Sequence, residues 1–323
     1  MMINTKIMGT GSYVPSKVLT NADLTKYVDT NDEWIQSRTG IKERHIVTDE
    51  GTTDLAYEAS VRAIEDSGIS KEDIDLVIVA TVTPDNYFPG VSNLLQARLG
   101  LEEVMTFDIN AACSGFIYAL NIADKMIKSG AYNNALVIGA ETLTRLTDWR
   151  DRNTCVLFGD AAGAMVISKS EENGIQDIIC GSKGDVDDLL ISRNIKIKDP
   201  ELNEVSKQDH IHMKGAEVFK FATRILPKTV NDLLDRNDIT LDDLDYMVAH
   251  QANERIISKA AKDLNFSMDK MFINIHKYGN TSAASVPLAI DEAIKTKVLK
   301  KGDKFITVAF GGGLTWGGAL IQL

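Results

Sequence analysis

The chain has 323 residues, of which 44% are hydrophobic and 25% charged, values that are ordinary for a globular protein with a large core. Its formal net charge is -11 and its sequence pI is about 5.0, which argues against non-specific binding to nucleic acid because that needs a basic surface. No apolar run reaches the roughly 18 residues of a membrane-spanning helix, and the N-terminus lacks the apolar core of a signal peptide, so we expect no membrane association.

Short apolar runs rich in β-branched residues alternate with amphipathic stretches along the chain. The runs that we expect to form strands buried on both faces are 76–80, 104–109, 135–140, 246–249 and 305–309. Between two of them, the stretch 116–129 has apolar residues at helical spacing and ends before Gly130. This alternation predicts an α/β fold.

Two pairs of similar segments indicate an internal duplication. Residues 68–80 (GISKEDIDLVIVA) and 238–250 (DITLDDLDYMVAH) each carry a Ser/Thr-x-x-Asp helix start followed by an apolar strand. Residues 156–167 (VLFGDAAGAMVI) and 308–321 (VAFGGGLTWGGALI) each read as a strand, a Phe-Gly, a small-residue turn and a second strand. Chance similarity between ordinary α–β junctions is the alternative. We interpret the pairs as two related halves, 1–170 and 171–323.

Charged segments occupy three places in the second half. The stretch 182–210 has weak periodicity and dense charge, which predicts an inserted loop or flap. Basic residues recur at helical spacing in two groups, which are Arg255, Lys259 and Lys262, and Lys220, Arg224 and Lys228. Each group is a candidate docking surface for an acidic partner or a solvated charged face, and Pro227 is a possible end of the second helix.

Three polar residues follow strands at points where helices begin. Cys113 follows the run 104–109, His250 follows 246–249, and Asn280 precedes a helical stretch. Ligands bind at such carboxyl ends of strands in α/β sheets. A cysteine at a helix start has its pKa lowered by the helix dipole and by unpaired N–H groups, which favours a nucleophile. A buried inert thiol and a core histidine are the alternatives.

The remaining cysteines and histidines offer no clear site. Cys155 and Cys180 lie within or beside apolar runs and are expected to be inert, and three cysteines form neither a disulfide framework nor a zinc pattern. His210 and His212 lack a third ligand nearby. We therefore expect reduced thiols, a cytoplasmic protein, and no metal or redox cofactor. The glycines of 310–317 suit an oxyanion hole or a hairpin turn.

Motifs along the chain resemble the β-ketoacyl-acyl-carrier-protein synthase III family. They occur in the family's order and are DEWIQSRTGIKERH (32–45), AACSGF (111–116), FGDAAGA (158–164), HQANERI (250–256), KYGNTSAAS (277–285) and FGGGLTWG (310–317). The resemblance implies a thiolase-like fold of two duplicated αβαβα halves in five layers, a homodimer, and a catalytic triad of Cys113, His250 and Asn280.

The activity implied is a decarboxylative Claisen condensation of an acyl-CoA primer, acetyl or short branched, with malonyl-acyl-carrier protein. Cys113 would carry the acyl group, and His250 and Asn280 would stabilise the enolate. Backbone N–H groups of Cys113 and Gly312 would form the oxyanion hole. This reaction initiates type II fatty-acid synthesis. No cysteine follows Cys180, which disfavours the thiolases themselves, because they need a second one.

The resemblance also implies binding roles. Trp34 and Arg152 would enclose the CoA adenine, and Arg38 would contact its phosphate. The residues that would line the remaining channel are Gly215 and Asn253 for pantetheine, and Phe88, from the partner subunit, and Leu314 for the acyl group. The carrier protein would dock on Arg255, Lys259, Lys262 and Lys220. Ordinary packing is the alternative for Trp34 and Phe88.

Departures from the family pattern leave the primer open. Ala161 stands where the family usually has glycine, Lys42 where arginine is common, and Leu314 where relatives have phenylalanine.

Three other functions remain as alternatives. One is a related Cys-His-Asn enzyme of polyketide or quinolone-type biosynthesis, another is a thiol hydrolase, and the third is a CoA-binding protein without activity.

Overall fold

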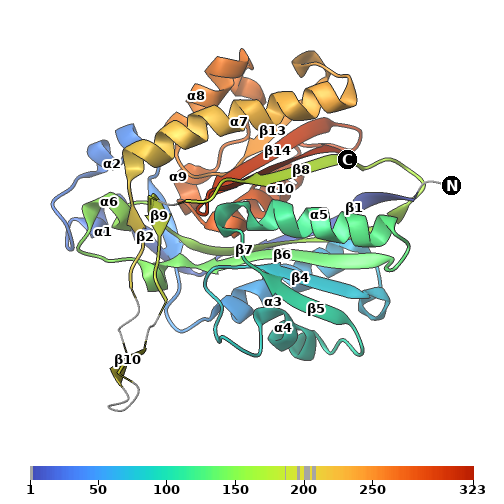
Figure 1. Ribbon diagram of the computed structural model, residues 1–323, viewed down its shortest axis with the longest axis horizontal. Coiled ribbons are helices and arrows are strands. Elements are labelled where there is room, and N and C mark those ends of the chain that lie inside the picture. Colours follow the sequence, from blue (N-terminus) through green and yellow to red (C-terminus); the bar gives the residue numbers. More distant parts are fainter. Residues whose placement is uncertain (1–2, 186, 195–196, 200–203, 206–208) are drawn as a thin grey trace.

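The computed structural model describes residues 3–185, 187–194, 197–199, 204–205 and 209–323, and two sheets form its centre (Figure 1). The five strands of the first sheet, in spatial order, are β1 (Asn4–Tyr13), β7 (Asp160–Ser170), β6 (Asn134–Thr142), β4 (Leu76–Ala80) and β5 (Met105–Ile109). Strands β6, β4 and β5 are parallel, while β1 and β7 pair antiparallel. Strand β4 is buried along its whole length, as its apolar run predicts.

The second sheet has four strands, and its order, given from the parallel end, matches that of β4, β6, β7 and β1 in the first sheet. They are β13 (Tyr246–Ala249), β14 (Lys304–Gly311), β15 (Thr315–Gln322) and β8 (Ile175–Ser182). Strands β13 and β14 are parallel, and β15 and β8 continue the sheet antiparallel. The first sheet therefore corresponds to the second, strand for strand, apart from β5.

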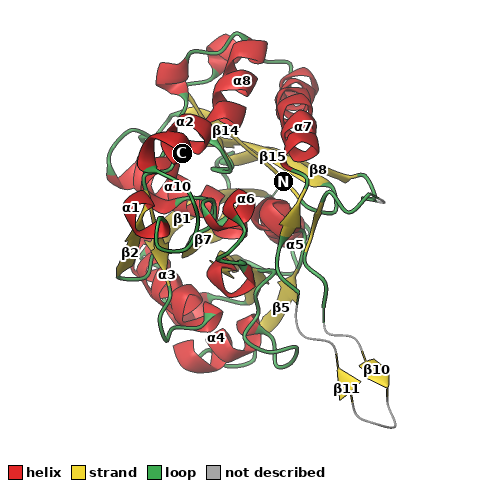
Figure 2. Ribbon diagram, turned by 90° about the vertical axis from the view of Figure 1, so that its left-hand side faces the viewer, coloured by secondary structure: helices red, strands yellow, loops and turns green. Residues whose placement is uncertain are grey.

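Helices complete five layers (Figures 1 and 2). Helices α5 (Gly115–Lys128) and α10 (Ser285–Lys295) lie between the two sheets and share one apolar core with both. Helices α3 (Thr52–Ser67) and α4 (Val91–Leu99) cover the outer face of the first sheet. Helices α7 (Gly215–Asn237) and α8 (Glu254–Leu264) cover the outer face of the second sheet. This is the five-layered α/β architecture that the resemblance implies.

Short elements surround the ends of the strands. The helical ones are α1 (Asn21–Leu24), α2 (Asp32–Thr39), η1 (Lys71–Asp73), η2 (Ala112–Ser114), η3 (Leu143–Leu146), α6 (Arg152–Cys155), η4 (Leu241–Asp243), η5 (Met268–Lys270), α9 (Ile275–Tyr278) and η6 (Ser282–Ala284). The strands are β2 (Lys17–Thr20), β3 (Glu43–Ile46), β9 (Leu190–Ile191), β10 (Ile197–Asp199), β11 (Glu204–Val205) and β12 (His212–Met213). The last four lie in or beside the predicted loop or flap 182–210, parts of which fall outside the described residues.

Backbone conformation repeats between the halves at the predicted spacing. Gly68 and Asp238, which end α3 and α7, are both left-handed, with φ of 66° and 54°. Ala112 and Ser282, at the starts of η2 and η6, are also left-handed, with φ of 46° and 48°. The first sheet ends at Ser170, and β8 opens the second at Ile175. We retain the division after residue 170 as a proposal, because these features support it.

Two local predictions are wrong. The Phe-Gly pairs are not equivalent, since Phe310 and Gly311 end strand β14, whereas Phe158 and Gly159 lie in the segment between α6 and β7. Helix α7 also continues through Pro227 rather than ending there. Apolar side chains on both sides of the proline pack on the second sheet, and this burial outweighs the local cost.

Two glycines allow strands to touch the turns that begin the central helices. A Cβ atom at Gly311 of β14 would lie 2.6 Å from the backbone nitrogen of Cys113. A Cβ atom at Gly139 of β6 would lie 2.3 Å from the carbonyl oxygen of Ala283 in η6. Each turn therefore rests on strand backbone, and a side chain at either glycine would displace it.

Replacing Gly139 with alanine should therefore destabilise the protein. We expect the free energy of unfolding to fall by roughly 1–3 kcal/mol, the usual cost of overpacking, when measured by urea denaturation. Gly184→Ala is the matched control, because a Cβ atom there meets no atom within 4 Å. Equal effects of the two substitutions would contradict the packing described.

Candidate active site

Cys113 lies in η2, between the end of β5 and the start of α5. Its side chain is buried, with 9% exposure. Turn η2 packs against β14 on one side and against η6 on the other. The cysteine of the first half is therefore placed against elements of the second half.

Burial raises the pKa of the Cys113 thiol to about 12, and the charge of Glu141 adds to this rise. Hydrogen bonds with Ser282 and with its own backbone N–H act in the opposite direction but do not outweigh burial. The prediction that the helix start would lower this pKa is therefore wrong for the resting protein. The thiol carries its proton at neutral pH, and a reaction at the sulfur needs a group that accepts this proton.

His250 follows β13 and has 1% exposure. Its backbone N–H donates to Val308 at 2.8 Å, its ring packs edge-on against Phe310, and its Nδ1 lies 2.5 Å from Ser285 Oγ. Burial lowers the pKa of this imidazole to about 3, so the ring is neutral at neutral pH. With Nδ1 held by a hydroxyl, Nε2 is the ring nitrogen left for a ligand.

Asn280 lies between α9 and η6 and has 8% exposure. The prediction that it follows a strand is therefore wrong, because the residues before it form the short helix α9. Its backbone N–H donates to Leu157 at 2.8 Å, and its carbonyl oxygen accepts from Gly159 at 3.1 Å. Its Oδ1 accepts from the backbone N–H of Ser282 at 2.9 Å. The amide NH₂ has no hydrogen-bond acceptor among the described residues, and it is therefore the end of the side chain available to a ligand.

Turn η6 connects the three predicted residues. The turn packs against η2, which carries Cys113. Ser282 in η6 donates its backbone N–H to Asn280 Oδ1, and the hydroxyl of Ser285, which follows the turn, contacts His250. Sequence reasoning missed both serines. The available signal was the 170-residue repeat, in which Ser282 is the equivalent of Ala112. In the structure both residues have the left-handed backbone conformation.

Glu141 is a further group that the sequence analysis missed. Its side chain is fully buried at the end of β6. Its carboxylate oxygens accept hydrogen bonds from Val82 N at 3.1 Å, Thr83 Oγ1 at 2.7 Å and Ser282 Oγ at 3.1 Å. Burial raises the pKa of this carboxyl to about 7, although the hydrogen bonds lower it in part. An acidic residue directly after the apolar run 135–140 was the signal in the sequence.

The residues predicted to bind CoA form one cluster beside α2. The guanidinium carbons of Arg38 and Arg152 lie 4.8 and 4.7 Å from the Trp34 ring centre. Asn253 caps α8 and donates from Nδ2 to the carbonyl oxygen of Arg38 at 3.0 Å. An adenine between Trp34 and Arg152 would need a separation of roughly 7 Å, so Arg152 must move to admit one. Gly215 is exposed at the start of α7.

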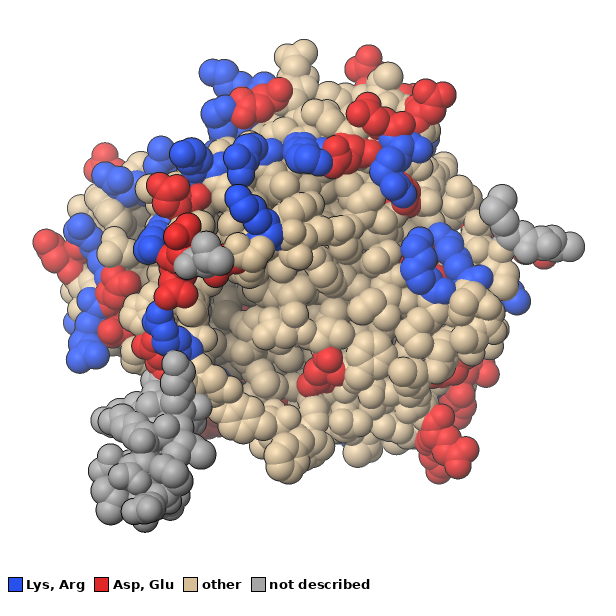
Figure 3. Space-filling view, viewed as in Figure 1, with Lys and Arg blue, Asp and Glu red and all other residues tan. Residues whose placement is uncertain are grey.

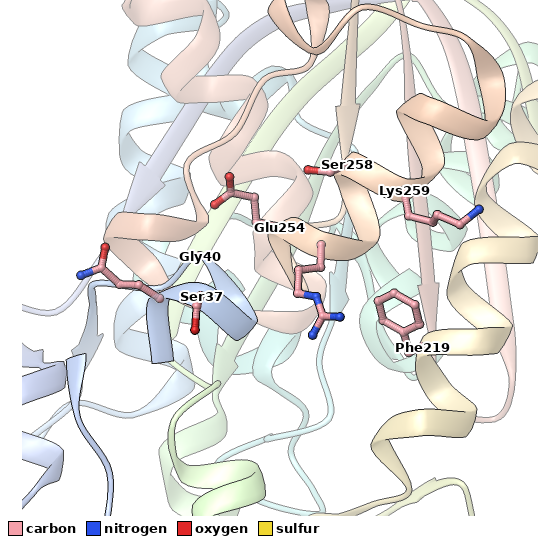
Figure 4. Close-up of a pocket in the computed structure, with 8 residues that line it drawn as sticks. Ser37, Gly40, Phe219, Glu254, Ser258 and Lys259 are labelled. Carbon is pink, nitrogen blue, oxygen red and sulfur yellow. The ribbon is translucent and has the colours of Figure 1, made fainter. Parts of the chain in front are cut away.

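A pocket of about 400 Å³ adjoins this cluster, between α2 and α8 (Figure 4). Its lining residues are Gln36, Ser37, Gly40, Phe219, Glu254, Arg255, Ser258 and Lys259. Figure 4 shows Glu254 next to Gly40 and Ser37, and Lys259 on the same side of the pocket as Phe219 of α7. The Arg255 guanidinium lies 5.7 Å from the Phe219 ring centre.

The predicted basic groups lie on the neighbouring helices α7 and α8. Figure 3 shows Lys and Arg side chains in a row along α7. Lys228 and Lys259 each pair with an aspartate one helical turn away. Among the described residues, no carboxylate pairs with Lys220, Arg255 or Lys262, so these three keep their charge for a partner.

The other predicted site residues lie in two places. Gly312 and Leu314 are in the turn between β14 and β15. Leu314, with 7% exposure, belongs to the core under α7, and its backbone N–H and carbonyl both bond to Lys183, at 2.7 and 2.8 Å. Gly312 faces Leu190 of β9. Phe88 is apart from all of them, on the surface, with 86% exposure.

In the described ranges, no group of three or more His, Cys, Asp or Glu side chains is arranged to hold a metal ion. His212 instead pairs with Asp209 at 2.8 Å. None of the described helices is both long and apolar enough to cross a membrane.

Comparisons with known proteins extend over the whole chain. Two family models match, 3-oxoacyl-[acyl-carrier-protein] synthase III over residues 107–184 and its C-terminal part over 234–323. A β-ketoacyl-[acyl-carrier-protein] synthase III of Clostridium acetobutylicum is 51% identical over 322 residues, which are 99% of each chain.

Solved structures agree with this result. The 3-oxoacyl-[acyl-carrier-protein] synthase III of Aquifex aeolicus has a TM-score of 0.92 and 47% identity, and the match covers 99% of this chain and 100% of that chain. The priming β-ketosynthase of the R1128 polyketide biosynthetic pathway has a TM-score of 0.91 and 32% identity, covering 100% of this chain and 97% of that chain.

The five layers and the duplicated sheets define a thiolase-like enzyme. Sequence identity to a relative over the full length identifies the family within this class. The chain belongs to the β-ketoacyl-[acyl-carrier-protein] synthase III family. It is an acyltransferase of the condensing type, as the resemblance predicts.

The low pKa of His250 predicts acid sensitivity. An unfolded histidine binds its proton near its ordinary pKa of 6.5, whereas the folded one does so near 3. The unfolded state therefore gains stability as pH falls from 6.5 towards 3, by roughly 2 kcal/mol between pH 7 and pH 5. Urea unfolding at the two pH values should show this loss in the wild type and not in His250→Gln. The same loss in both proteins would contradict a buried neutral imidazole.

Proposed function

We propose that this chain condenses an acyl-CoA primer with malonyl-acyl-carrier protein, releasing CO₂ and forming a 3-oxoacyl-acyl-carrier protein. Cys113 carries the acyl group, and the reaction initiates type II fatty-acid synthesis. The arrangement of Cys113, His250 and Asn280 around η6 supports this proposal most strongly. It offers one nucleophile and two neutral hydrogen-bond donors, and neither donor needs to lose or gain a proton at neutral pH.

In the first half-reaction, Cys113 attacks the thioester carbonyl of the acyl-CoA. A covalent acyl-enzyme divides one difficult step into two easier ones and lets a single site use two thioesters in turn. The oxyanion is held by the backbone N–H groups of Cys113 and Gly312. The contact of Gly311 with the Cys113 backbone supports this role, because it brings the turn between β14 and β15, which contains Gly312, next to the nucleophile.

In the second half-reaction, the malonyl group loses CO₂ and a negative charge develops on the thioester oxygen. The Asn280 amide donates to this oxygen through Nδ2, and His250 donates through Nε2. The contact between Nδ1 and the Ser285 hydroxyl supports the histidine role, because the ring hydrogen lies on Nε2 when this hydroxyl is the donor. The carbanion then attacks the acyl group on Cys113.

The cluster of Trp34, Arg38, Arg152 and Asn253 binds the nucleotide end of CoA. An aromatic ring and a guanidinium both stack on adenine, and a second guanidinium suits phosphate. The hydrogen bond from Asn253 to Arg38 supports one continuous channel, in which Gly215 and Asn253 contact pantetheine. The acyl group contacts Leu314, which lies in the turn between β14 and β15.

The carrier protein docks on the basic residues at the mouth of this channel. Carrier proteins are acidic, and this chain is acidic as well, so docking needs a local basic surface. Lys220, Arg255, Lys259 and Lys262 provide it on the packed pair α7 and α8. Arg255 and Lys259 also line the adjoining pocket of about 400 Å³, which lies next to the proposed CoA site.

The enzyme acts as a homodimer in the cytoplasm without a metal or redox cofactor. Strand β5 forms an edge of the first sheet, and its Met105 is 44% exposed. Phe88 is 86% exposed on the segment between β4 and α4. Unpaired edges and exposed large apolar side chains are usually covered in the native assembly, and a second copy would place Phe88 at the partner's acyl pocket.

A second candidate is a polyketide or quinolone-type condensing enzyme. The similarity to the R1128 priming ketosynthase favours this candidate over a hydrolase or an inactive binding protein. Both candidates share Cys113, His250 and Asn280, so the product distinguishes them.

Purified enzyme should convert acyl-CoA and malonyl-acyl-carrier protein to a 3-oxoacyl-acyl-carrier protein, measured by mass spectrometry of the carrier. Cys113→Ala should abolish the product. His250→Ala and Asn280→Ala should each slow decarboxylation by roughly 100-fold or more and leave acylation of Cys113 measurable. Normal decarboxylation in both variants would refute their roles, and free acid without a new carbon–carbon bond would identify a hydrolase.

Charge reversal at Arg255 tests docking. Arg255→Glu should raise the KM for malonyl-acyl-carrier protein by roughly tenfold and leave the KM for acyl-CoA nearly unchanged, because only the protein partner contacts this surface. Lys301→Glu is the control, since this exposed lysine lies outside the docking surface. A similar rise for both substrates, or for both variants, would remove the docking role.

A further inference from the structure

Gln251, two residues after the end of β13, has a side-chain amide with four hydrogen-bond partners and 1% exposure. Its Nε2 donates to the carbonyl oxygens of Ala249 at 2.8 Å and of Phe272 at 3.1 Å. Its Oε1 accepts from the backbone N–H groups of Asn274 at 3.0 Å and of Ile275 at 3.2 Å. Both hydrogens of the amide nitrogen and both lone pairs of the oxygen are therefore used, and the orientation of the amide is fixed.

The two ends of this amide hold the two segments that carry the enolate donors. The nitrogen end holds the last residue of β13, directly before His250. The oxygen end holds the N–H groups that begin α9, including that of Ile275. Gly279, at the end of α9, donates its N–H to the carbonyl oxygen of Ile275 at 2.9 Å, and Asn280 comes next. Because α9 is a single turn, holding its start also places its end.

We propose that Gln251 is a positioning residue that sets the separation between the His250 and Asn280 donors, so that both reach the same oxygen of the malonyl thioester. This role rests on the proposed function, in which the two side chains stabilise one developing negative charge. Donors aimed at such a charge must be in place before the reaction, and a displacement of about 1 Å can slow a reaction by roughly a hundredfold. Gln251 acts through its neighbours and does not touch the substrate.

The other hydrogen bonds of α9 hold it to other elements. The carbonyl oxygen of His276 accepts from the N–H of Lys42, before β3, at 3.1 Å. Asn274 Nδ2 donates to Glu292 Oε2 of α10 at 2.8 Å. Among the described residues, only the Gln251 side chain forms hydrogen bonds between the end of β13 and the start of α9. The position of α9 relative to His250 therefore depends on this amide.

The fold as a whole has a separate connection between these segments. The N–H of Phe272 donates to the carbonyl oxygen of Met247, within β13, at 3.0 Å. Met271, with 7% exposure, packs in the apolar core under α7 and α8. These contacts lie farther along the chain from Asn280 than the Gln251 amide does. A substitution at Gln251 should thus displace α9 and leave the second sheet in place.

Gln251→Glu tests the role, because it keeps the size of the side chain and removes both N–H donors. Decarboxylation of malonyl-acyl-carrier protein, followed as CO₂ release, should slow by roughly tenfold or more. Acylation of Cys113 by acyl-CoA, followed by intact mass, should stay within about threefold of the wild-type rate, since this half-reaction does not use the enolate donors. Gln251→Met, which cannot form these hydrogen bonds, should give the same difference between the half-reactions.

Combination with Asn280→Ala separates positioning from a general structural defect. Without the Asn280 donor, the separation of the two donors no longer matters. Gln251→Glu should therefore slow decarboxylation by less than about threefold in the Asn280→Ala protein. A general defect would slow both proteins by the same factor.

Gln96→Glu is the matched control, since Gln96 is a partly buried glutamine of α4 whose Nε2 donates to the carbonyl oxygen of Leu101 at 3.3 Å. It should leave both half-reactions within about twofold of the wild type. Equal losses in acylation and decarboxylation, or a tenfold loss that persists in the Asn280→Ala protein, would overturn the positioning role.

Hydrogen exchange tests the contact without any substrate. The N–H groups of Asn274 and Ile275 should exchange faster in Gln251→Met than in the wild type or in Gln96→Glu, measured by mass spectrometry of peptides, because they lose their acceptor. Unchanged exchange would overturn the proposal.

The positioning role and the proposed function fail in different ways. A wild type that makes no 3-oxoacyl product would reject the proposed function and the positioning role with it. Normal product from the wild type, together with normal decarboxylation in Gln251→Glu and Gln251→Met, would reject the positioning role alone.

Discussion

The contact between the turns η2 and η6, each resting on the backbone of a strand, is the constraint on which the site depends. Gly311 of the second half lies against Cys113, and Gly139 of the first half lies against Ala283. Both turns begin with a left-handed residue, Ala112 or Ser282. Because each turn lies between the two sheets, the positions of the reactive groups are fixed by the core rather than by mobile loops.

Burial sets the chemistry of these groups. The same desolvation raises the pKa of the Cys113 thiol and of the Glu141 carboxyl and lowers that of the His250 imidazole, because it disfavours the charged form of each. All three groups are thus shifted towards neutrality in the resting protein. A reaction at the sulfur must then move a proton within the site, and an enolate must be stabilised by dipoles and N–H groups rather than by a resident positive charge.

The sequence predicted the architecture well because its signals are local and strong. The β4 run 76–80 and the β13 run 246–249 are continuously apolar, and the 170-residue repeat places them at equivalent positions. The strand ends then predict where Cys113 and His250 lie, whereas Asn280 follows the short helix α9 rather than a strand. The helix break at Pro227 was wrong, since the burial of α7 on the second sheet outweighs the cost of one lost hydrogen bond.

The missed features depend on contacts across the two halves. A serine such as Ser282 gives no signal by itself, and only the fold places it against Glu141 of the first half, in a turn that packs on the one carrying Cys113. The raised pKa of Cys113 also depends on burial by residues distant in sequence, whereas the helix dipole is a local feature.

The most direct measurement is the intact mass of the enzyme after brief incubation with acetyl-CoA and with branched acyl-CoAs, followed by peptide mapping and compared with Cys113→Ala. Our account predicts a gain of one acyl group, located on Cys113 and absent from the variant. No gain with any acyl-CoA, or a gain that persists in Cys113→Ala, would contradict the claim that this buried thiol accepts the primer.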